Sequence, residues 1–303
     1  MTGLNIFQWN ADGLNSHSHE LRARFKLNQG PHIACIQETK FSKKSKFTLA
    51  NYNTVRTDRA KTKTVRASGG LLILIREDIN YEEIKVNTPN LEANDIQITL
   101  NNRKINIINI YHWREQKIQQ EDLNKLIQIG NKSTIFLGDF NAHHPFWGTG
   151  DKLDNHGKLI SDWIETNDLV LLNNNQPTRY DKQNRDMSAI DLTICTADLA
   201  QSTQWEVHHA PLGSDHFPIN ITIGNTNVPT QTINSEPKFN YNQANWDKFH
   251  EICNQANLNE LENSDPEIFC KNLTDYIINA AKTSIPLKKI NWANPRYHGG
   301  MRK

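Results

Sequence analysis

The sequence is poor in cysteine, with four residues in a chain of 303: Cys35, Cys195, Cys253 and Cys270. They lie far apart and have none of the spacings that bind zinc, which argues against a thiolate metal site. We expect them to be buried thiols of a protein from a reducing compartment.

Long hydrophobic runs, a leader segment and an excess of charge are also missing. No apolar stretch is long enough to span a bilayer, and Met1 leads directly into a strand-like segment without a basic and then apolar signal. The net charge is +1, so a basic face for nucleic acid would have to be local. There is no glycine-rich Walker loop, which argues against nucleotide hydrolysis of that type. We expect a soluble, intracellular protein with no membrane partner.

The composition that remains, 37% hydrophobic and 22% charged, is typical of a globular protein of one large domain or two modest ones. Its clearest local pattern is the stretch 133–141, which predicts a short buried strand ending at Gly138. Asp139 and Asn141 follow, and side chains two positions apart share a face. The pattern favours either a functional strand end or a simple polar turn.

Other predicted strands end in the same way. The segment 4–10 delivers Asn10, the segment 31–39 delivers Glu38, and the hairpin of 91–100 with 104–111 delivers Tyr111. Further polar groups at strand ends are Asp12, Asp191, Asp215 and His216. Several carboxylates and amides with few histidines or thiols form an oxygen-rich set suited to Mg²⁺ or Mn²⁺. Such an ion with one imidazole fits phosphoryl chemistry.

Strands alternate with helices and hairpins up to about residue 224, and 225–240 has the Asn, Thr and Pro content of a linker. We expect a domain at 1–224 and a helical extension at 241–303. Its two helices are predicted at 245–256 and 265–283, followed by a loosely ordered tail.

Two polar segments allow more than one interpretation. Basic residues cluster at 40–46 and 56–66, as surface loops or as a rim that follows phosphates. The neighbours His143 and His144 are a weak zinc signal, and we favour a packed loop.

Six segments occur in the order found in the endonuclease/exonuclease/phosphatase superfamily. They are 9–14 (Trp-Asn-Ala-Asp-Gly-Leu), 37–39 (Gln-Glu-Thr), 110–111 (Ile-Tyr), 138–141 (Gly-Asp-Phe-Asn), 188–191 (Ser-Ala-Ile-Asp) and 214–216 (Ser-Asp-His). The chain resembles in particular the apurinic-type endonuclease of non-LTR, jockey-like retrotransposons, through 138–144 and 177–179. The resemblance implies a four-layered α/β sandwich with two mostly antiparallel sheets packed face to face, over residues 1–224.

The resemblance also implies roles for individual residues. Glu38 would be the main metal ligand, with Asn10, Asp12 and Asp215 around it. Asp139 would orient and deprotonate water, and Asn141 would hold either the phosphate or Asp139. His216 would contact the scissile phosphate, with Asp191 fixing its tautomer, and Tyr111 would donate to the phosphate or assist the leaving oxygen. The DNA-binding residues implied at a minor-groove hairpin are Thr178, Arg179, Tyr180, Lys182 and Arg185.

The implied function is Mg²⁺- or Mn²⁺-dependent nicking of double-stranded DNA to leave a 3′-hydroxyl and a 5′-phosphate, as in target-primed reverse transcription. A reverse transcriptase partner would lie elsewhere in the full element, because no Tyr/Phe-x-Asp-Asp polymerase signature is present, and a nuclear location would follow. In place of the proline-rich turn common after this tyrosine stands His112-Trp113. The alternatives are an abasic-site repair endonuclease, a phosphatase on the same fold, or a non-catalytic DNA-binding remnant.

Overall fold

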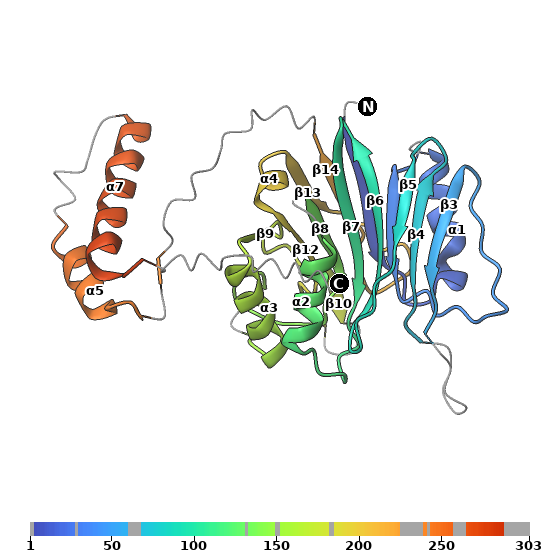
Figure 1. Cartoon of the computed structure of the whole chain (residues 1–303), viewed down its shortest axis with the longest axis horizontal. Helices are drawn as coiled ribbons and strands as arrows, with labels where there is room; N and C mark the ends of the chain where they lie inside the picture. Colours follow the sequence, from blue (N-terminus) through green and yellow to red (C-terminus); the bar gives the residue numbers. More distant parts are fainter. Residues whose placement is uncertain are drawn as a thin grey trace, which may run out of the picture. The chain divides into compact units, whose positions relative to one another are not determined.

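The computed structural model describes residues 3–27, 30–59, 68–130, 133–148, 152–181, 185–224, 239–240, 243–256 and 265–287. The chain divides into two compact units, Met1–Val228 and Pro229–Lys303, and each unit is described by itself (Figure 1). The first unit contains both sheets and every residue singled out for chemistry.

The first sheet has six strands in the order β13-β14-β1-β2-β4-β3. Its strands are β1 (Leu4–Asn10), β2 (Ile33–Gln37), β3 (Tyr52–Thr57), β4 (Leu71–Arg76), β13 (Thr203–Val207) and β14 (Ile219–Ile223). Only β1 and β2 pair in parallel, and the other neighbours are antiparallel. The polar ends of β1 and β2 therefore lie at one edge of this sheet.

The second sheet has six strands in the order β5-β6-β7-β8-β12-β9. Its strands are β5 (Tyr81–Ile84), β6 (Glu92–Leu100), β7 (Arg103–Tyr111), β8 (Thr134–Asp139), β9 (Leu169–Leu171) and β12 (Asp191–Thr196). The predicted hairpin is β6–β7, where Asn101 and Asn102 adopt φ values of 50° and 63°, as a tight hairpin turn requires. Here only β7 and β8 are parallel.

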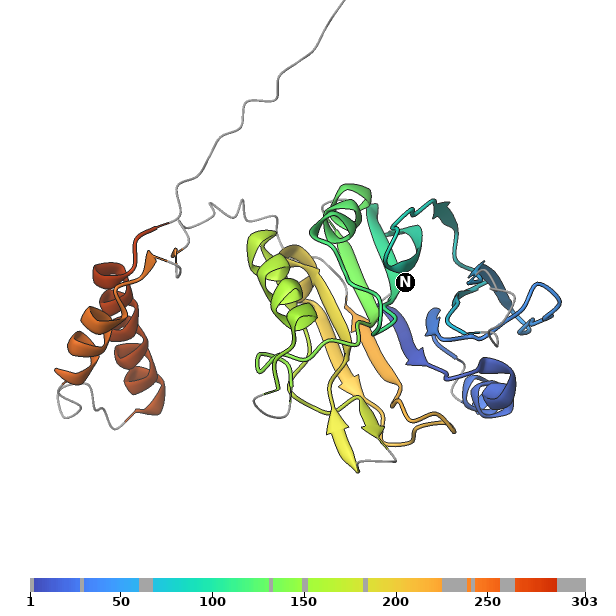
Figure 2. The same cartoon turned by 90° about the horizontal axis from the view of Figure 1, so that it is seen from below.

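The two sheets pack face to face, and helices cover both outer faces (Figures 1 and 2). Apolar side chains of both sheets form the central core, such as Ile73 with Ile107 and Ile221. Helix α1 (Leu14–Leu27) packs on the outer face of the first sheet, and α2 (Gln120–Ile129) and α3 (Asn155–Thr166) pack on that of the second. The predicted four-layered α/β sandwich is thus confirmed. A short helix, α4 (Ala197–Ala200), follows β12.

A small separate hairpin stands beside the sheets, formed by β10 (Arg179–Asp181) and β11 (Asp186–Ser188). The sequence pattern predicts one strand through 188–194, but β11 ends at Ser188 and β12 begins at Asp191. The reason is local: the backbone N–H groups of Ile190 and Asp191 donate to the Thr178 hydroxyl at 3.2 and 3.1 Å instead of to a neighbouring strand.

The second unit contains α5 (Trp246–Asn254) and α7 (Pro266–Ser284). The Asn245 side chain caps α5 by accepting from the Lys248 N–H at 2.9 Å, and the Tyr276 hydroxyl of α7 donates to the Ile252 carbonyl at 2.7 Å. Residues 225–238 of the expected linker and 288–303 of the expected tail lie outside the described residues. Across the part of the chain with described structure, no helix has the length and apolar character needed to cross a membrane.

The cysteine prediction is only half right. Cys35 and Cys195 are buried in the first unit, but Cys253 is half-buried and Cys270 is exposed. The last two lie on α5 and α7, a helix pair too small to bury every apolar position.

Candidate active site

Strand register aligns three of the predicted site residues across the second sheet. Tyr111 on β7 pairs in register with Asp139 on β8, and Asp191 on β12 pairs with Asp139 from the other side. Gly138 permits this arrangement: its φ is 148°, and a Cβ there would collide with the Ile110 carbonyl of β7. One line of residues therefore carries a phenol and two carboxylates to the same edge.

The side chain of Asn10 joins the two sheets. Its amide N–H₂ group donates to Asp139 Oδ2 at 2.8 Å and to Glu38 Oε1 at 3.2 Å. Both amide hydrogens are thereby used, while Asn10 Oδ1 accepts from the Asp12 N–H at 3.0 Å. The carboxylates of Glu38, from the first sheet, and Asp139, from the second, are thus brought to one amide group.

His216 and Asp191 form a buried imidazole–carboxylate pair. His216 Nδ1 lies 2.8 Å from Asp191 Oδ2, and the two side chains are 5% and 2% exposed. Burial alone would lower the pKa of His216, but the Asp191 carboxylate outweighs it and, with Asp139 and Asp215, raises the pKa to about 9. The ring is therefore an imidazolium at neutral pH, with Nε2 toward Asp139 Oδ2 at 4.0 Å.

Asp139 is buried at the centre of this group. Burial and the neighbouring Asp191 charge raise the pKa of Asp139 well above its usual range, against the opposing effect of the His216 charge. Its Oδ1 accepts from the Asn141 N–H at 2.9 Å. In its ionised form, a carboxylate with a raised pKa is a stronger base than an exposed one.

The loop after Asp139 is fixed by His112, a fully buried residue to which the sequence assigned no role. The backbone N–H of His112 donates to the Asp139 carbonyl at 2.9 Å, and its own carbonyl accepts from Asn141 Nδ2 at 2.9 Å. Its ring nitrogens face the carbonyl oxygens of Phe140 and Gln116. Because Asn141 Nδ2 also contacts Asp139 Oδ2 at 3.1 Å, both of its hydrogens serve the protein.

Several residues here adopt left-handed backbone that residues other than glycine rarely take. They are Asp12, Glu38, Lys40 and Asn141, with φ values of 45°, 48°, 51° and 46°. Such conformations cost on the order of 1–3 kcal/mol each and persist where surrounding contacts impose them. Other residues with such backbone lie in turns away from this site, for example Asn101 and Asn102.

The four predicted metal ligands are only partly brought together. Asp12 is half-exposed and pairs with Lys40, whose ammonium also lies 3.4 Å from Glu38 Oε2. Asp215 pairs with Arg179 at 2.9 Å and sits beside the His216 ring, with Nε2 3.9 Å from Asp215 Oδ1. Lys40 was missed as a site residue, because in the sequence it is one member of a basic cluster.

The donor chemistry nonetheless fits a hard divalent cation. Glu38 keeps an 18% exposed carboxylate, and a lysine ammonium already lies between it and Asp12, as expected where negative charge is concentrated. A second set, Asp139, Asp191 and His216, has ligand atoms within 4.8 Å of one another. In that set, Asp191 and His216 Nδ1 already contact each other, which leaves them less free to bind an ion. Glu38 with Asn10 is therefore the better candidate for the ion site.

Tyr111 is buried, and burial followed by the Glu38 and Asp139 charges raises the pKa of its phenol far above the usual range. The phenol therefore stays protonated, and its neutral hydroxyl can donate a hydrogen bond. The Arg59 guanidinium lies over the Tyr111 ring at 5.4 Å and the Trp113 ring at 5.2 Å, and pairs with Glu92. Arg59, from the second of the two basic clusters, thus contacts the ring of a predicted site residue.

Thr178, predicted to contact DNA, has a partner within the protein. Thr178 is fully buried, and its hydroxyl donates to Asp191 Oδ2 at 2.6 Å. Arg179 and Tyr180 lie on β10, and the Tyr180 N–H donates to the carbonyl of Asp215, the neighbour of His216, at 2.8 Å. Arg185 is exposed at the other side of the hairpin, and Lys182 lies outside the described residues.

Comparisons with known proteins show which chains this one resembles. Residues 105–220 match the family model described as "Endonuclease-reverse transcriptase". The RNA-directed DNA polymerase from mobile element jockey of Drosophila funebris is 23% identical over 220 residues, 71% of this chain. The chain spans only 23% of that relative's length.

Solved structures share the fold. The endonuclease domain of TRAS1, a telomere-specific non-LTR retrotransposon, has a TM-score of 0.61 at 20% identity, over 73% of this chain and 98% of its own. The AP endonuclease LMAP from Leishmania major has a TM-score of 0.58 at 12% identity, over 74% and 88%. The resemblance to endonuclease/exonuclease/phosphatase proteins, and among them to endonucleases of non-LTR retrotransposons, is thereby confirmed.

Proposed function

We propose, from that resemblance, that this chain is a metal-dependent endonuclease that nicks double-stranded DNA. Water would attack a phosphodiester, and the bond to the 3′ oxygen would break, leaving a 3′-hydroxyl and a 5′-phosphate. The observation that supports this best is the convergence of Glu38, Asp139 and His216, from three segments distant in sequence, around the single amide of Asn10 and its neighbours.

The protein groups divide the work by charge and proton content. Asp139, with its raised pKa, would orient the attacking water and take its proton. His216, kept cationic by Asp191, would contact the scissile phosphate and stabilise the charge that develops there. Tyr111, kept neutral, would donate to a phosphate oxygen or to the leaving oxygen. Asn141 would hold Asp139 rather than the phosphate, since both of its amide hydrogens are used.

A divalent cation, Mg²⁺ or Mn²⁺, would be held by Glu38 with Asn10 Oδ1, and by Asp12 and Asp215 directly or through water. When bound it would neutralise charge on the phosphate. Lys40, which contacts Asp12 and Glu38, would then have to move or share these carboxylates.

Residues Arg179, Tyr180, Lys182 and Arg185 of the β10–β11 hairpin would contact the DNA minor groove. Of these, Arg179 is attached to the site through Asp215, so that DNA contact and catalysis would be connected at one ion pair. In a full element the new 3′ end would prime a reverse transcriptase carried outside the matched region, and the protein would act in the nucleus.

A plasmid-nicking assay with Mg²⁺ or Mn²⁺, run beside an abasic oligonucleotide and a phosphoinositide, tests the proposal. We expect nicks in intact duplex DNA, with ends that a polymerase can extend. Cleavage restricted to the abasic site, or phosphate release alone, would instead identify one of the related activities on this fold. A protein that binds duplex DNA without cutting it under either metal would be a non-catalytic remnant.

A further inference from the structure

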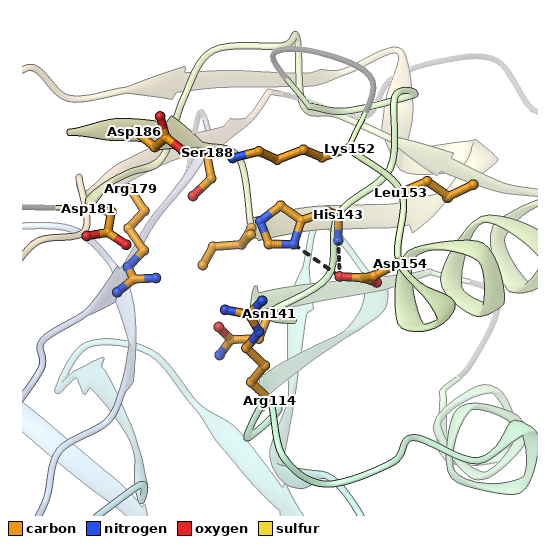
Figure 3. A pocket seen from close by; sticks show the side chains of 11 residues that line it. Arg114, Asn141, His143, Lys152, Leu153, Asp154, Arg179, Asp181, Asp186 and Ser188 are labelled. Atoms are coloured by element: carbon orange, nitrogen blue, oxygen red, sulfur yellow. Dashed lines mark hydrogen bonds and ion pairs between the residues drawn. The ribbon is translucent and has the colours of Figure 1, made fainter. Parts of the chain in front are cut away.

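Beside the proposed catalytic residues, the first unit has a cavity with a volume of about 350 Å³ (Figure 3). Its walls come from the loop after β8, the start of α3, the β10–β11 hairpin and the segment after β7. Lining residues include Arg114, Asn141, His143, Lys152, Arg179 and Ile190. Because Asn141 also holds Asp139, this cavity adjoins the place where the scissile phosphate would lie.

His143 projects into this cavity with a fixed orientation (Figure 3). Its Nδ1 and its backbone N–H each lie 3.1 Å from Asp154 Oδ2, while Asp154 Oδ1 accepts from the Gly157 N–H at 2.7 Å as the cap of α3. Gly157 has no Cβ, and one would collide with the His143 carbonyl. The other ring nitrogen, Nε2, therefore remains available to a ligand.

The cationic side chains that line the cavity differ in whether they form an ion pair. Lys152 pairs with Asp186 at 2.9 Å across the opening, and Arg179 pairs with Asp215 at 2.9 Å. Arg114 is exposed and, among the residues whose structure is described, makes no ion pair or hydrogen bond. It is a cation without a partner at the edge of a cavity that also presents the His143 ring.

We propose that this cavity binds the sugar–phosphate backbone of the cleaved strand one phosphate away from the scissile bond, through Arg114 and His143. The inference rests on the proposed function, because it takes DNA as the substrate. It assigns a role to the His143 side chain that is neither zinc binding nor loop packing.

The lining favours backbone over a base turned out of the helix. Enzymes that take up a base enclose it between aromatic or apolar faces, and here the only ring among the lining residues is the His143 imidazole. Ile190 and the exposed Leu153 are the sole apolar members of the lining. The polar remainder includes Asp154, Asp181 and Asp186, of which Asp154 contacts His143 and Asp186 pairs with Lys152. Such a surface suits an anion with a polar sugar.

The test is a double-mutant cycle between the protein and the DNA. Duplexes carry one neutral methylphosphonate linkage, moved stepwise along the strand, and binding is measured in EDTA so that no metal supports cutting. We expect Arg114→Ala to weaken binding about tenfold and to reduce the salt slope by about one. One neutral linkage should cause the same loss, and combining it with Arg114→Ala should cause no further loss.

Lys117→Ala is the matched control, since Lys117 is exposed, lies three positions from Arg114 and does not line the cavity. It should show additive losses with every linkage. His143→Gln serves as the second variant, and should couple to the same linkage as Arg114→Ala. Thermal unfolding of both variants checks that they fold.

Additive losses for Arg114→Ala at every linkage would overturn the inference. So would coupling to removal of a base instead of to a neutral linkage, because that would place a nucleobase in the cavity. Nicking by the unaltered chain decides the proposed function separately: a chain that nicks DNA but shows no coupling loses only this inference, and one that shows coupling but never nicks loses only the other.

Discussion

Two histidine–aspartate pairs in the described part of the first unit, His216 with Asp191 and His143 with Asp154, differ in what each carboxylate holds. Asp191 is buried, and its partners are the His216 ring and the Thr178 hydroxyl. Asp154 is partly exposed, and its partners include the backbone N–H groups of His143 and Gly157. The first carboxylate thus sets the charge of an imidazole, whereas the second fixes a loop to a helix and orients a ring. The residue types are the same in both pairs, and the role of each aspartate depends on its burial and on its hydrogen-bond partners.

The largest effect is expected from removing either half of the buried site. His216→Ala removes the cation beside the phosphate, and Asp139→Ala removes the proton acceptor, so each should reduce nicking by about 10³-fold or more. Duplex binding should stay largely intact in both, as measured by gel shift beside the plasmid assay. Nicking retained by either variant would contradict the role assigned to that residue.

A smaller loss is expected from Thr178→Val, which keeps the shape but deletes the hydroxyl that donates to Asp191. One hydrogen bond to a charged group is worth about 1.5–3 kcal/mol, so kcat should fall roughly tenfold to a hundredfold. The pH profile of kcat should shift as well, because loss of this hydrogen bond changes how strongly the Asp191 carboxylate stabilises the protonated His216 ring. Loss of duplex affinity with unchanged kcat would restore the idea that Thr178 serves DNA contact.

Asp154→Ala tests the other pair. Loss of the α3 cap and the His143 contacts should lower the free energy of unfolding by about 1–2 kcal/mol, measured by urea denaturation. The KM for duplex should rise a few fold with little change in kcat, since the ring loses its orientation but the reacting groups do not. A large fall in kcat would mean that the pairs are not separate in function.

Another buried carboxylate, Asp95 on β6, contacts no histidine among the described residues, and burial is the largest influence on its pKa. Its Oδ2 accepts from Asn106 at 2.9 Å, and burial raises the pKa of Asp95 to about 7. Folding then favours the protonated form, so this contribution is complete below about pH 4 and is lost as pH rises through 7. Asp95→Asn should therefore raise Tm at pH 8 relative to the unaltered chain and change it little at pH 4. Equal shifts at both pH values would contradict this assignment.

Patterning along the chain was sufficient to place the central strands and the polar groups at their ends. Asn10 could be singled out because it ends an alternating strand, and Glu38 and Asp139 because each follows a short continuous apolar run; both patterns are local properties of the sequence. Edge strands such as β3 and β13 were missed: β3 is polar over most of its length, and β13 is only five residues long, so neither contains a long apolar run.

Partners distant in the sequence could not be found in the same way. Thr178 looked like part of a surface motif, but its contact is Asp191 across a turn; His112 gave no signal that it would hold the loop of Phe140. Lys40 was hidden within a basic cluster, although it follows Glu38 by two residues. Each of these roles depends on which segments the fold brings together, a result of packing and not of local propensity.

The amide of Asn10 has a consequence for how activity and folding are related. It donates to Glu38 from one sheet and to Asp139 from the other, so a sideways slip of the sandwich by about one hydrogen-bond length would separate the two acids. A chain with only one sheet formed would bring together only half of the polar residues. Partly folded chains should therefore not cut DNA, and cutting would begin only when the two sheets have packed together.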